Sequence, residues 1–299
     1  MLGEGVLGKS WLDGKTIIIT GASSGIGREL TKILIEKNSC HIIGIGRNEE
    51  KMQKLVCDLG VNADKFEYRL FDVSIEHNWK DFADDLKSRQ IDIIINNAGV
   101  LPPFATFDKL SNLSRESYQS VKVTGAKNLV GSECAELLST MDINFNSVVY
   151  ACHYFIPIIE KSSSCAIINI ASSAGLCPLP GISLYTASKA ALKNFTEAIS
   201  LEKKYYIGLI CPGFTKTEIF RAQKRNYNGK LISLIATSLD KMTKKIYKGI
   251  SKKKKRMVFG VDAKFMDVMY RFFPKASVRF IRNVMKASRI DLFRDIFDY

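Results

Sequence analysis

Residues 16–27 read TIIITGASSGIG, a short apolar run followed by a glycine-rich turn with the spacing GxxxGxG. The amphipathic stretch Gly27–Lys37 comes next, so we expect the turn to join a buried strand to a helix. Glycines at such a junction let the backbone approach a ligand, and the N–H groups that open the helix attract phosphate. The turn therefore predicts a dinucleotide pyrophosphate site, although a tight strand–helix turn without a ligand is the alternative. The candidate contacts are Gly21, Ser23, Ser24, Gly25, Ile26 and Gly27.

The alternation of short apolar runs and helix-length stretches continues for about 215 residues. Continuous Ile-rich runs are typical of strands buried on both faces, and strands that alternate with helices are typical of βαβ units. The predicted strands are Thr16–Thr20, His41–Ile45, Phe66–Phe71, Ile91–Asn96, Ala166–Ile170 and Ile207–Cys211. The predicted helices are Gly27–Lys37, Glu49–Leu59, Ile75–Ser88, Ser139–Lys161 and Tyr185–Lys203. We therefore expect an α/β protein with a Rossmann-type doubly wound parallel sheet and a helical C-terminal extension.

The domain organisation is predicted to be a single domain over residues 1–299, because no internal repeat or low-complexity linker divides the chain. Its core spans about 12–220. An insert over about 104–136 departs from the strand–helix rhythm and is either an interaction surface or a tolerated surface loop. From about 218 only helices are expected, beginning with a lid over about 218–234.

Composition excludes several classes of protein. With 46% hydrophobic and 25% charged residues, the chain is neither collagen-like nor wholly disordered. Its longest nearly unbroken apolar stretch, Val148–Ile159, is shorter than the roughly 20 residues that a membrane span needs. No signal peptide is apparent, and the seven cysteines form no CxxC pair. We expect reduced thiols, a cytoplasmic location and no metal site.

The net charge of +14 is concentrated in the C-terminal fifth, where residues 241–299 hold 17 Lys or Arg and 5 Asp or Glu. This segment includes Lys252–Arg256 and many apolar residues. It fits either a helical layer with a solvated charged face or a surface that meets an anionic membrane, which would favour a lipid-like substrate. A third alternative is nucleic acid, but no nucleic-acid-binding module accompanies the cluster, so such a partner is not expected.

Four motifs in order resemble the short-chain dehydrogenase/reductase family. They are the TGxxxGxG of residues 20–27, Asn96-Asn97-Ala98-Gly99, the YxxxK of Tyr185–Lys189, and Pro212-Gly213. The resemblance covers about residues 12–220 and implies a nicotinamide dinucleotide. It further implies cofactor contacts at Asn97, Ala98, Gly99, Tyr185, Lys189, Pro212, Gly213, Thr215 and Thr217.

The end of the second predicted strand indicates which dinucleotide binds. An acidic residue there would accept the ribose 2′-hydroxyl of NAD, but the chain carries Arg47 instead. We therefore expect NADP(H) in preference to NAD(H), with Ser24 also near the 2′-phosphate, unless Arg47 is only a solvated surface residue. Asp72 and Val73 match the family's adenine contact, although Asp72 also suits a helix cap.

The YxxxK pattern occurs twice, at Tyr118–Lys122 and at Tyr185–Lys189. The second copy has Ser172 thirteen residues upstream, as the family requires, whereas Tyr118 has Ala105 there. Residues i and i+4 share a helix face, so Lys189 lies near Tyr185 and favours its phenolate. Tyr185 would then exchange a proton with the substrate oxygen.

The resemblance adds two further catalytic residues. Ser172 would orient the substrate oxygen, with Ser173 as a competitor at a spacing of twelve. Asn144 would retain a relay water beneath Lys189, or would bond a backbone carbonyl instead.

The sequence thus predicts an NADP(H)-dependent enzyme that moves hydride between nicotinamide and a small-molecule carbonyl or secondary alcohol. The resemblance also implies a homodimer or homotetramer. The alternatives are a non-catalytic NADP(H)-binding sensor or scaffold, and a sugar epimerase or dehydratase, which the loop spacing disfavours.

Overall fold

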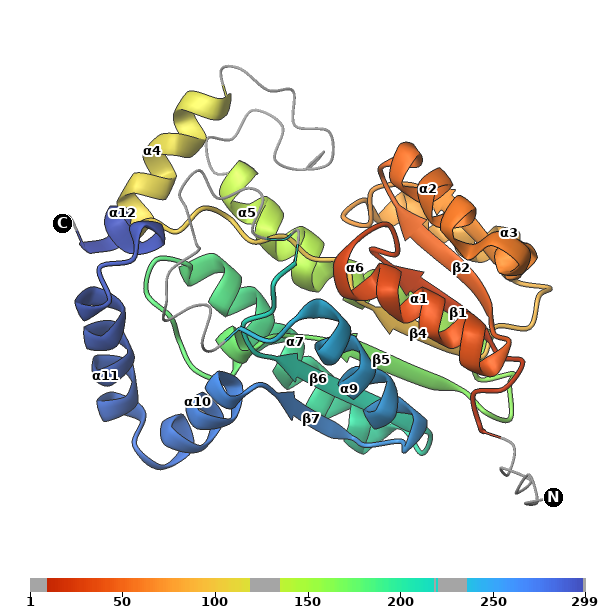
Figure 1. The fold of residues 1–299 in the computed structure, drawn as a ribbon. Coiled ribbons are helices and arrows are strands. Elements are labelled where there is room, and N and C mark those ends of the chain that lie inside the picture. The colour runs from red at the N-terminus through yellow and green to blue at the C-terminus, as the bar shows by residue number, and fades with distance from the viewer. Residues whose placement is uncertain (1–9, 119–134, 218, 220–235, 298–299) are drawn as a thin grey trace.

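The computed structural model describes residues 10–118, 135–217, 219 and 236–297. Its centre is a parallel sheet with the strand order β3-β2-β1-β4-β5-β6-β7 (Figure 1). The strands are β1 Thr16–Thr20, β2 His41–Gly46, β3 Phe66–Leu70, β4 Ile93–Asn96, β5 Ala166–Ile170, β6 Tyr206–Pro212 and β7 Arg256–Phe259. The principal helices are α1 Gly25–Asn38, α2 Glu49–Leu59, α3 Glu76–Leu86, α4 Phe107–Tyr118, α5 Ala135–Met141, α6 Ser147–Ile159, α7 Ser183–Glu202, α9 Leu239–Ser251, α10 Val261–Phe272, α11 Pro274–Ala287 and α12 Arg294–Phe297. This is the expected Rossmann-type architecture.

The sheet is covered by helices on both faces because alternate residues of a strand point to opposite sides. Ile17 and Ile19 of β1 pack in one apolar cluster with residues of α1, α2 and α9. Ile18 packs in a second cluster with residues of α3, α6 and α7. Both clusters are essentially inaccessible to solvent, which is why the strands are continuous apolar runs.

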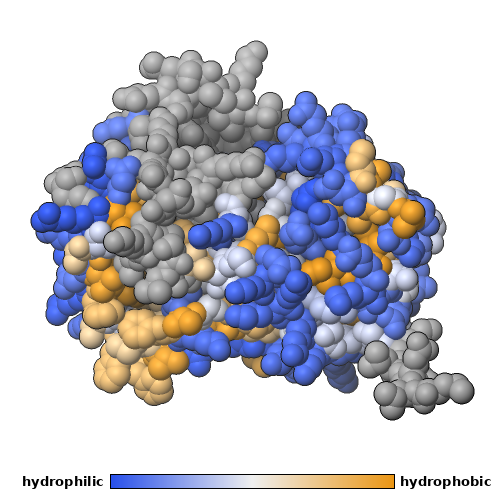
Figure 2. Space-filling view, in the orientation of Figure 1, coloured by the Kyte–Doolittle hydropathy of each residue, from blue (hydrophilic) through white to orange (hydrophobic). Residues whose placement is uncertain are grey.

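The C-terminal region corrects one expectation. Residues 256–259 were expected within a helical extension, but they form β7, which pairs with β6 from Leu209↔Arg256 to Pro212↔Phe259. The run is only four residues long and follows four lysines, so its sequence pattern is too short to separate a strand from a helix. The remainder is helical, and in Figure 2 apolar residues gather over α10 and α11.

A second difference lies in the expected helix Ser139–Lys161. The structure has α5, then a single π-helical turn at Asp142–Asn146, then α6. Such a turn inserts an extra residue into the helix and is frequent at functional sites. Asn144 lies in it.

The arrangement of strands determines where a site can form. β1 lies between β2 and β4. The strands β2 and β3 are added on one side of β1 and the strands β4 to β7 on the other, so the strand order reverses at β1. All seven strands are parallel and present their carboxyl ends at one edge. Ligands of doubly wound sheets bind in the crevice at such a switch point.

Buried polar side chains link the strands beside this edge to α7. Asn96 Nδ2 donates to Asn169 Oδ1 at 2.8 Å, and Asn169 Nδ2 donates to Thr196 Oγ1 at 2.9 Å. The chain of bonds joins β4 and β5 to the helix that carries Tyr185 and Lys189. It aligns the two sides of the crevice.

Across residues 10–118, 135–217, 219 and 236–297, no helix combines the length and the apolar character that crossing a membrane requires.

The fold leaves no room for a side chain at Gly27. A Cβ atom there would overlap with Asn97 Nδ2 and the Gly21 carbonyl oxygen. We expect Gly27→Ala to lower the free energy of unfolding in urea by about 1–3 kcal/mol, because α1 must shift away from the sheet. Glu29→Ala, which removes only surface ion pairs of the same helix, should cost less than about 1 kcal/mol. Equal losses in the two variants would contradict this account.

Candidate active site

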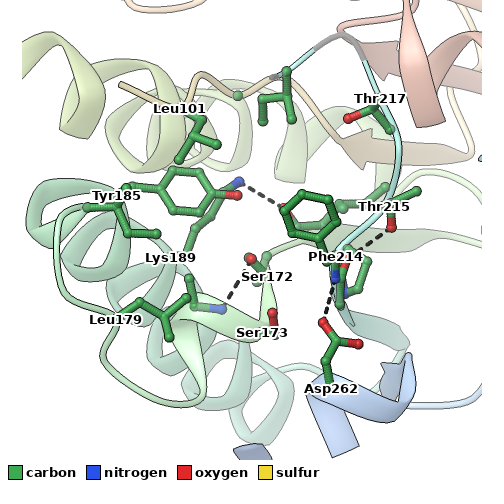
Figure 3. A pocket seen from close by; sticks show the side chains of 18 of the residues that line it. Leu101, Ser172, Ser173, Leu179, Tyr185, Lys189, Phe214, Thr215, Thr217 and Asp262 are labelled. Atoms are coloured by element: carbon green, nitrogen blue, oxygen red, sulfur yellow. Dashed lines mark hydrogen bonds between the residues drawn. The ribbon is translucent and has the colours of Figure 1, made fainter. Parts of the chain in front are cut away.

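A cavity of about 830 Å³ opens at the carboxyl ends of the strands. Its wall contains most of the residues that the sequence predicts for a site: Gly21, Ser24, Gly25, Ile26, Asn97, Ala98, Gly99, Ser172, Tyr185, Lys189, Pro212, Gly213, Thr215 and Thr217. Figure 3 shows Tyr185, Lys189 and Ser172 on one side of this space and Phe214, Thr215 and Thr217 on the other. Six predicted residues do not line it: Ser23, Gly27, Arg47, Asp72, Val73 and Asn144.

The glycine loop forms one end of the cavity. Gly21 has φ +67°, a conformation that favours glycine. The Thr20 hydroxyl accepts hydrogen bonds from the backbone N–H groups of Asn97 and Ala98, both at 2.9 Å. The Asn97 amide donates in return to the Thr20 carbonyl at 2.9 Å. These bonds hold the loop against the end of β4.

The start of α1 fits a phosphate group. The first turn of this 14-residue helix carries no acidic side chain, and Ser24, Gly25 and Ile26 line the cavity. Free N–H groups and the helix dipole favour an anion at this point. Gly27 does not reach the cavity, because it packs against Asn97.

Arg47 directly follows the end of β2. Arg47 is 60% exposed and pairs with Asp72, with 3.1 Å between Nη1 and Oδ2. Asp72 also accepts from the backbone N–H and hydroxyl of Ser74, so in this structure it serves the following turn. Val73 is buried in the apolar cluster around Trp79. None of these three lines the cavity.

Lys51, which sequence reasoning missed, does line the cavity, together with Ser24 and Gly25. It lies in the first turn of α2, and its backbone N–H donates to the Asn48 side chain that caps this helix. The available signal in the sequence was a second basic residue shortly after Arg47, at the start of the next predicted helix. The cavity end nearest β2 therefore has a positive charge beside the glycine loop.

Tyr185 and Lys189 are placed by α7. They lie on the buried face of the helix, and this face continues with Leu192, Thr196 and Ile199, each about one turn after the one before. Lys189 Nζ lies 5.9 Å from the centroid of the Tyr185 ring and donates to the Ile170 carbonyl at 3.1 Å. The expected helix-face pairing is present.

Ser172 follows β5 and begins a short 3-10 turn. Its Oγ accepts from the backbone N–H of Ala174 at 3.2 Å. Ser173 lines the same cavity. The second YxxxK pattern begins at Tyr118, the last residue of α4, and Lys122 lies outside the described residues.

Burial changes the protonation of the pair. It raises the pKa of Tyr185 above its ordinary value, and a hydrogen bond with Ser172 partly opposes this rise. It lowers the pKa of Lys189 to about 8, because the ammonium loses its hydration. The phenol pKa is therefore not depressed in the chain without a ligand, and its depression by Lys189 together with the charge of a bound cofactor stays a prediction. Tyr185 is protonated at neutral pH, as a proton donor must be.

Asn144 is fully buried and holds the backbone of residue 100. Its Oδ1 accepts from the Val100 N–H at 2.8 Å, and its Nδ2 donates to the Val100 carbonyl and the Ser188 hydroxyl, both at 3.0 Å. The alternative of a backbone-bonded Asn144 is therefore what the structure shows. The residue aligns the NNAG segment with α7 without lining the cavity.

The segment after β6 is held by Asp262, a second residue without a sequence signal. Asp262 Oδ2 accepts from the Phe214 N–H at 2.6 Å. Thr215 is buried and donates to the Gly213 carbonyl, and Thr217 lines the cavity. The expected lid over 218–234 falls almost wholly outside the described residues, which include only Ile219.

The remaining wall is apolar and comes mainly from the C-terminal region. Tyr185 belongs to a cluster with Leu101 and Phe104 at the start of the insert and with Met285 and Phe293 near the C-terminus. The Phe104 and Phe293 rings lie 5.6 Å apart. The C-terminal helices thus complete the cavity beside the phenol.

Comparison with known proteins agrees with this geometry. A sequence model of the family described as "short chain dehydrogenase" matches residues 15–228. Benzil reductase ((S)-benzoin forming) IRC24 of Saccharomyces cerevisiae is 31% identical over 213 residues, which cover 69% of this chain and 73% of that protein.

Two solved structures share the fold. The short-chain dehydrogenase of Sphingobium yanoikuyae in complex with NADPH has a TM-score of 0.67 at 20% identity and covers 91% of this chain and 95% of its own. A short-chain dehydrogenase/reductase of Burkholderia phymatum in complex with NAD has a TM-score of 0.66 at 20% identity, with coverages of 94% and 97%. The chain therefore belongs to the short-chain dehydrogenase family.

Proposed function

We propose that the protein is an NADP(H)-dependent oxidoreductase that reduces a hydrophobic ketone or aldehyde to its alcohol, or catalyses the reverse reaction. Membership of the family makes it an oxidoreductase of alcohol and carbonyl groups that uses a nicotinamide cofactor. The observation that carries the proposal is that buried Tyr185 and Lys189 and half-buried Ser172 line one cavity with the glycine loop.

Each side chain has a task in reduction. The bound nicotinamide would supply the hydride to the carbonyl carbon. Tyr185 donates its phenolic proton to the carbonyl oxygen and is left as a phenolate. Lys189, charged below pH 8, stabilises that phenolate. Ser172 accepts the Ala174 N–H and bonds Tyr185, and its hydroxyl hydrogen would bond the substrate oxygen when substrate is present.

The wall beside these groups supports an apolar substrate. Leu101, Leu179, Ile182, Met285 and Phe293 line the cavity around Tyr185. Burying apolar substrate surface there contributes about 25 cal/mol per Å². A benzil reductase among the relatives acts on an aromatic ketone by its name, which agrees with this surface.

NADP(H) is proposed over NAD(H) because of the charges near β2. Lys51 lines the cavity beside Ser24, and Arg47 lies four residues earlier, before the N-cap Asn48 of α2. Arg47 would exchange its partner Asp72 for a 2′-phosphate. The solved relatives include both an NADPH complex and an NAD complex, so the preference rests on these side chains.

Assembly into a homodimer or homotetramer and a cytoplasmic location stay predictions. A sensor or scaffold that only binds the cofactor is the competing function. It has no use for a buried phenol beside a buried ammonium, which makes turnover the deciding measurement.

Tyr185→Phe should lower turnover of a ketone panel with NADPH by roughly 10²–10⁴-fold, because the proton donor is lost. NADPH binding, followed by its fluorescence, should persist. Ser172→Ala should lose at least about tenfold, since a hydrogen bond to the reacting oxygen is worth roughly 1.5–3 kcal/mol when that oxygen carries charge. Ser173→Ala serves as the matched control and should stay within about twofold of the native rate. Undiminished turnover in Tyr185→Phe would exclude the mechanism.

The pH profile should report Lys189. We expect kcat/KM for reduction to fall as the pH rises through about 8, because neutral Lys189 no longer stabilises the phenolate. Tyr185, with its raised pKa, stays protonated over this interval. A profile that is level to pH 10 would contradict the assignment.

Lys189→Met tests the same group through stability. The pKa of Lys189 is lower in the folded chain than in the unfolded chain, so its charge opposes folding fully below pH 8 and not above about pH 10.5. At pH 7 the variant should lose turnover and gain up to about 3 kcal/mol in free energy of unfolding. Lost turnover with a large loss of stability would indicate a structural role instead.

Arg47→Ala with Lys51→Ala should lower kcat/KM with NADPH by about tenfold or more and change the value with NADH by less than about threefold. The physical reason is the loss of charge-assisted bonds to the 2′-phosphate. Steady-state kinetics with both cofactors measures the ratio. Arg69→Ala, which removes an exposed arginine of β3, is the control and should leave the ratio unchanged. Equal losses with both cofactors would refute the preference.

A further inference from the structure

The two helices after β7 expose an unusual amount of apolar surface. On α10 the spacing of the exposed apolar residues is four, three and four, which places them on one face of the helix. The same surface continues over the start and middle of α11, and the Phe265 and Phe280 rings lie 5.8 Å apart. We call it the α10–α11 face. Its exposed residues are Val261, Phe265, Val268, Phe272, Phe273, Phe280 and Val284.

This face is not needed to hold the helices in place. Ala263 and Met266 of α10 and Met285 of α11 are buried on the inner side. Phe272 and Phe273 nevertheless remain 72% and 59% exposed. Figure 2 shows a continuous apolar patch in the region of α10 and α11, at the lower left of the view. Contiguous apolar patches of this kind mark interaction surfaces.

The charge around the face is positive. Residues 261–290 hold seven Lys or Arg and two Asp. One of the two, Asp267, is already bound to Arg256 at 2.8 Å and to Arg271 at 3.1 Å. α11 carries Lys275, Arg279, Arg282 and Lys286 and no acidic residue, and all four are exposed. An apolar face among basic side chains is typical of helices that lie in the interface of an anionic membrane.

The face is continuous with the cavity. Val261, Phe265, Phe280 and Val284 belong to the exposed surface and also line the cavity beside Tyr185. An apolar molecule can therefore pass from the face to the phenol along apolar side chains.

We propose that the α10–α11 face docks on the surface of an anionic lipid bilayer, and that the hydrophobic substrate enters the cavity from the lipid phase. A second copy of the chain fits this face less well, because a symmetric contact would bring the two sets of basic side chains together. The docking is independent of the proposed reaction, whereas the entry route rests on it.

The lysine run Lys252–Lys255 takes no part in this surface. It precedes β7 and so lies at the amino ends of the strands. The cavity lies at the opposite, carboxyl ends. Lys253 Nζ lies 4.6 Å from the centroid of the Trp11 ring. The basic segment of the sequence is thus divided between two regions of the molecule.

Co-sedimentation of the full chain with vesicles tests the docking. We expect binding to phosphatidylcholine vesicles that contain phosphatidylserine to be at least about tenfold stronger than binding to phosphatidylcholine alone, since each basic residue near the surface adds about 1 kcal/mol. Phe272→Ser with Phe273→Ser should weaken binding by at least about tenfold. Neither residue lines the cavity, so turnover of a water-soluble ketone should be unchanged.

Two controls separate this surface from exposed apolar or basic residues in general. Val61→Ser with Leu201→Ser alters residues that are 97% and 89% exposed elsewhere, and Lys252→Glu with Lys254→Glu alters the remote lysines. Both should retain most of the vesicle binding. Equal loss in the Val61/Leu201 or lysine control, or no binding by the native chain, would overturn the docking.

The remaining outcomes are also decisive. A change of molar mass in light scattering for Phe272→Ser with Phe273→Ser, without vesicle binding by the native chain, would assign the face to a second copy. Vesicle binding by a chain without reductase activity would keep the docking and reject the proposed function. Unchanged turnover of a lipid-like ketone on addition of vesicles would reject the entry route alone.

Discussion

The clasp between the ends of β1 and β4 is the constraint on which the site depends. One hydroxyl, that of Thr20, receives two backbone N–H groups from the neighbouring strand end, and Asn97 returns a hydrogen bond to the Thr20 carbonyl. The ladder between β1 and β4 ends at Ile19↔Ile95, so these bonds extend the contact of the two strands into their loops. The clasp holds the glycine loop directly against residues 96–99. The cavity floor follows from that alignment.

The second requirement is a buried positive charge, which the fold tolerates at a cost. Lys189 bonds the Ile170 carbonyl, and the neighbouring residue Ser188 is held by Asn144. The π-helical turn brings Asn144 to Val100, so three separate segments meet beneath the ammonium. The buried ammonium lowers the free energy of unfolding, as functional groups commonly do. In return, it lies close to the protonated phenol of Tyr185.

Much of this arrangement was predictable from local pattern. Apolar runs located six of the seven strands, and helix periodicity placed Tyr185 beside Lys189. The assignment of Ser172 came from the spacing that the resemblance to the family implies. β7 was missed since four residues carry too little periodicity. Lys51 and Asp262 were missed because their roles depend on neighbours from distant segments. Burial, a tertiary property, raises the pKa of Tyr185 in the chain without a cofactor.

Two segments that differ from the regular strand–helix rhythm meet on the same side of the molecule. Lys109 of α4 donates from Nζ to the Asp295 carbonyl at 3.2 Å, and Gly181 leaves just enough space for Ile296. The apolar wall of the cavity is thus built from two segments that contact each other, the start of the insert and the C-terminal region. The proton-transfer groups lie instead at the end of β5 and on α7. A substitution that changes the size of Phe104 or Phe293 would therefore alter the fit of both segments at once, while the proton-transfer groups keep their own supports.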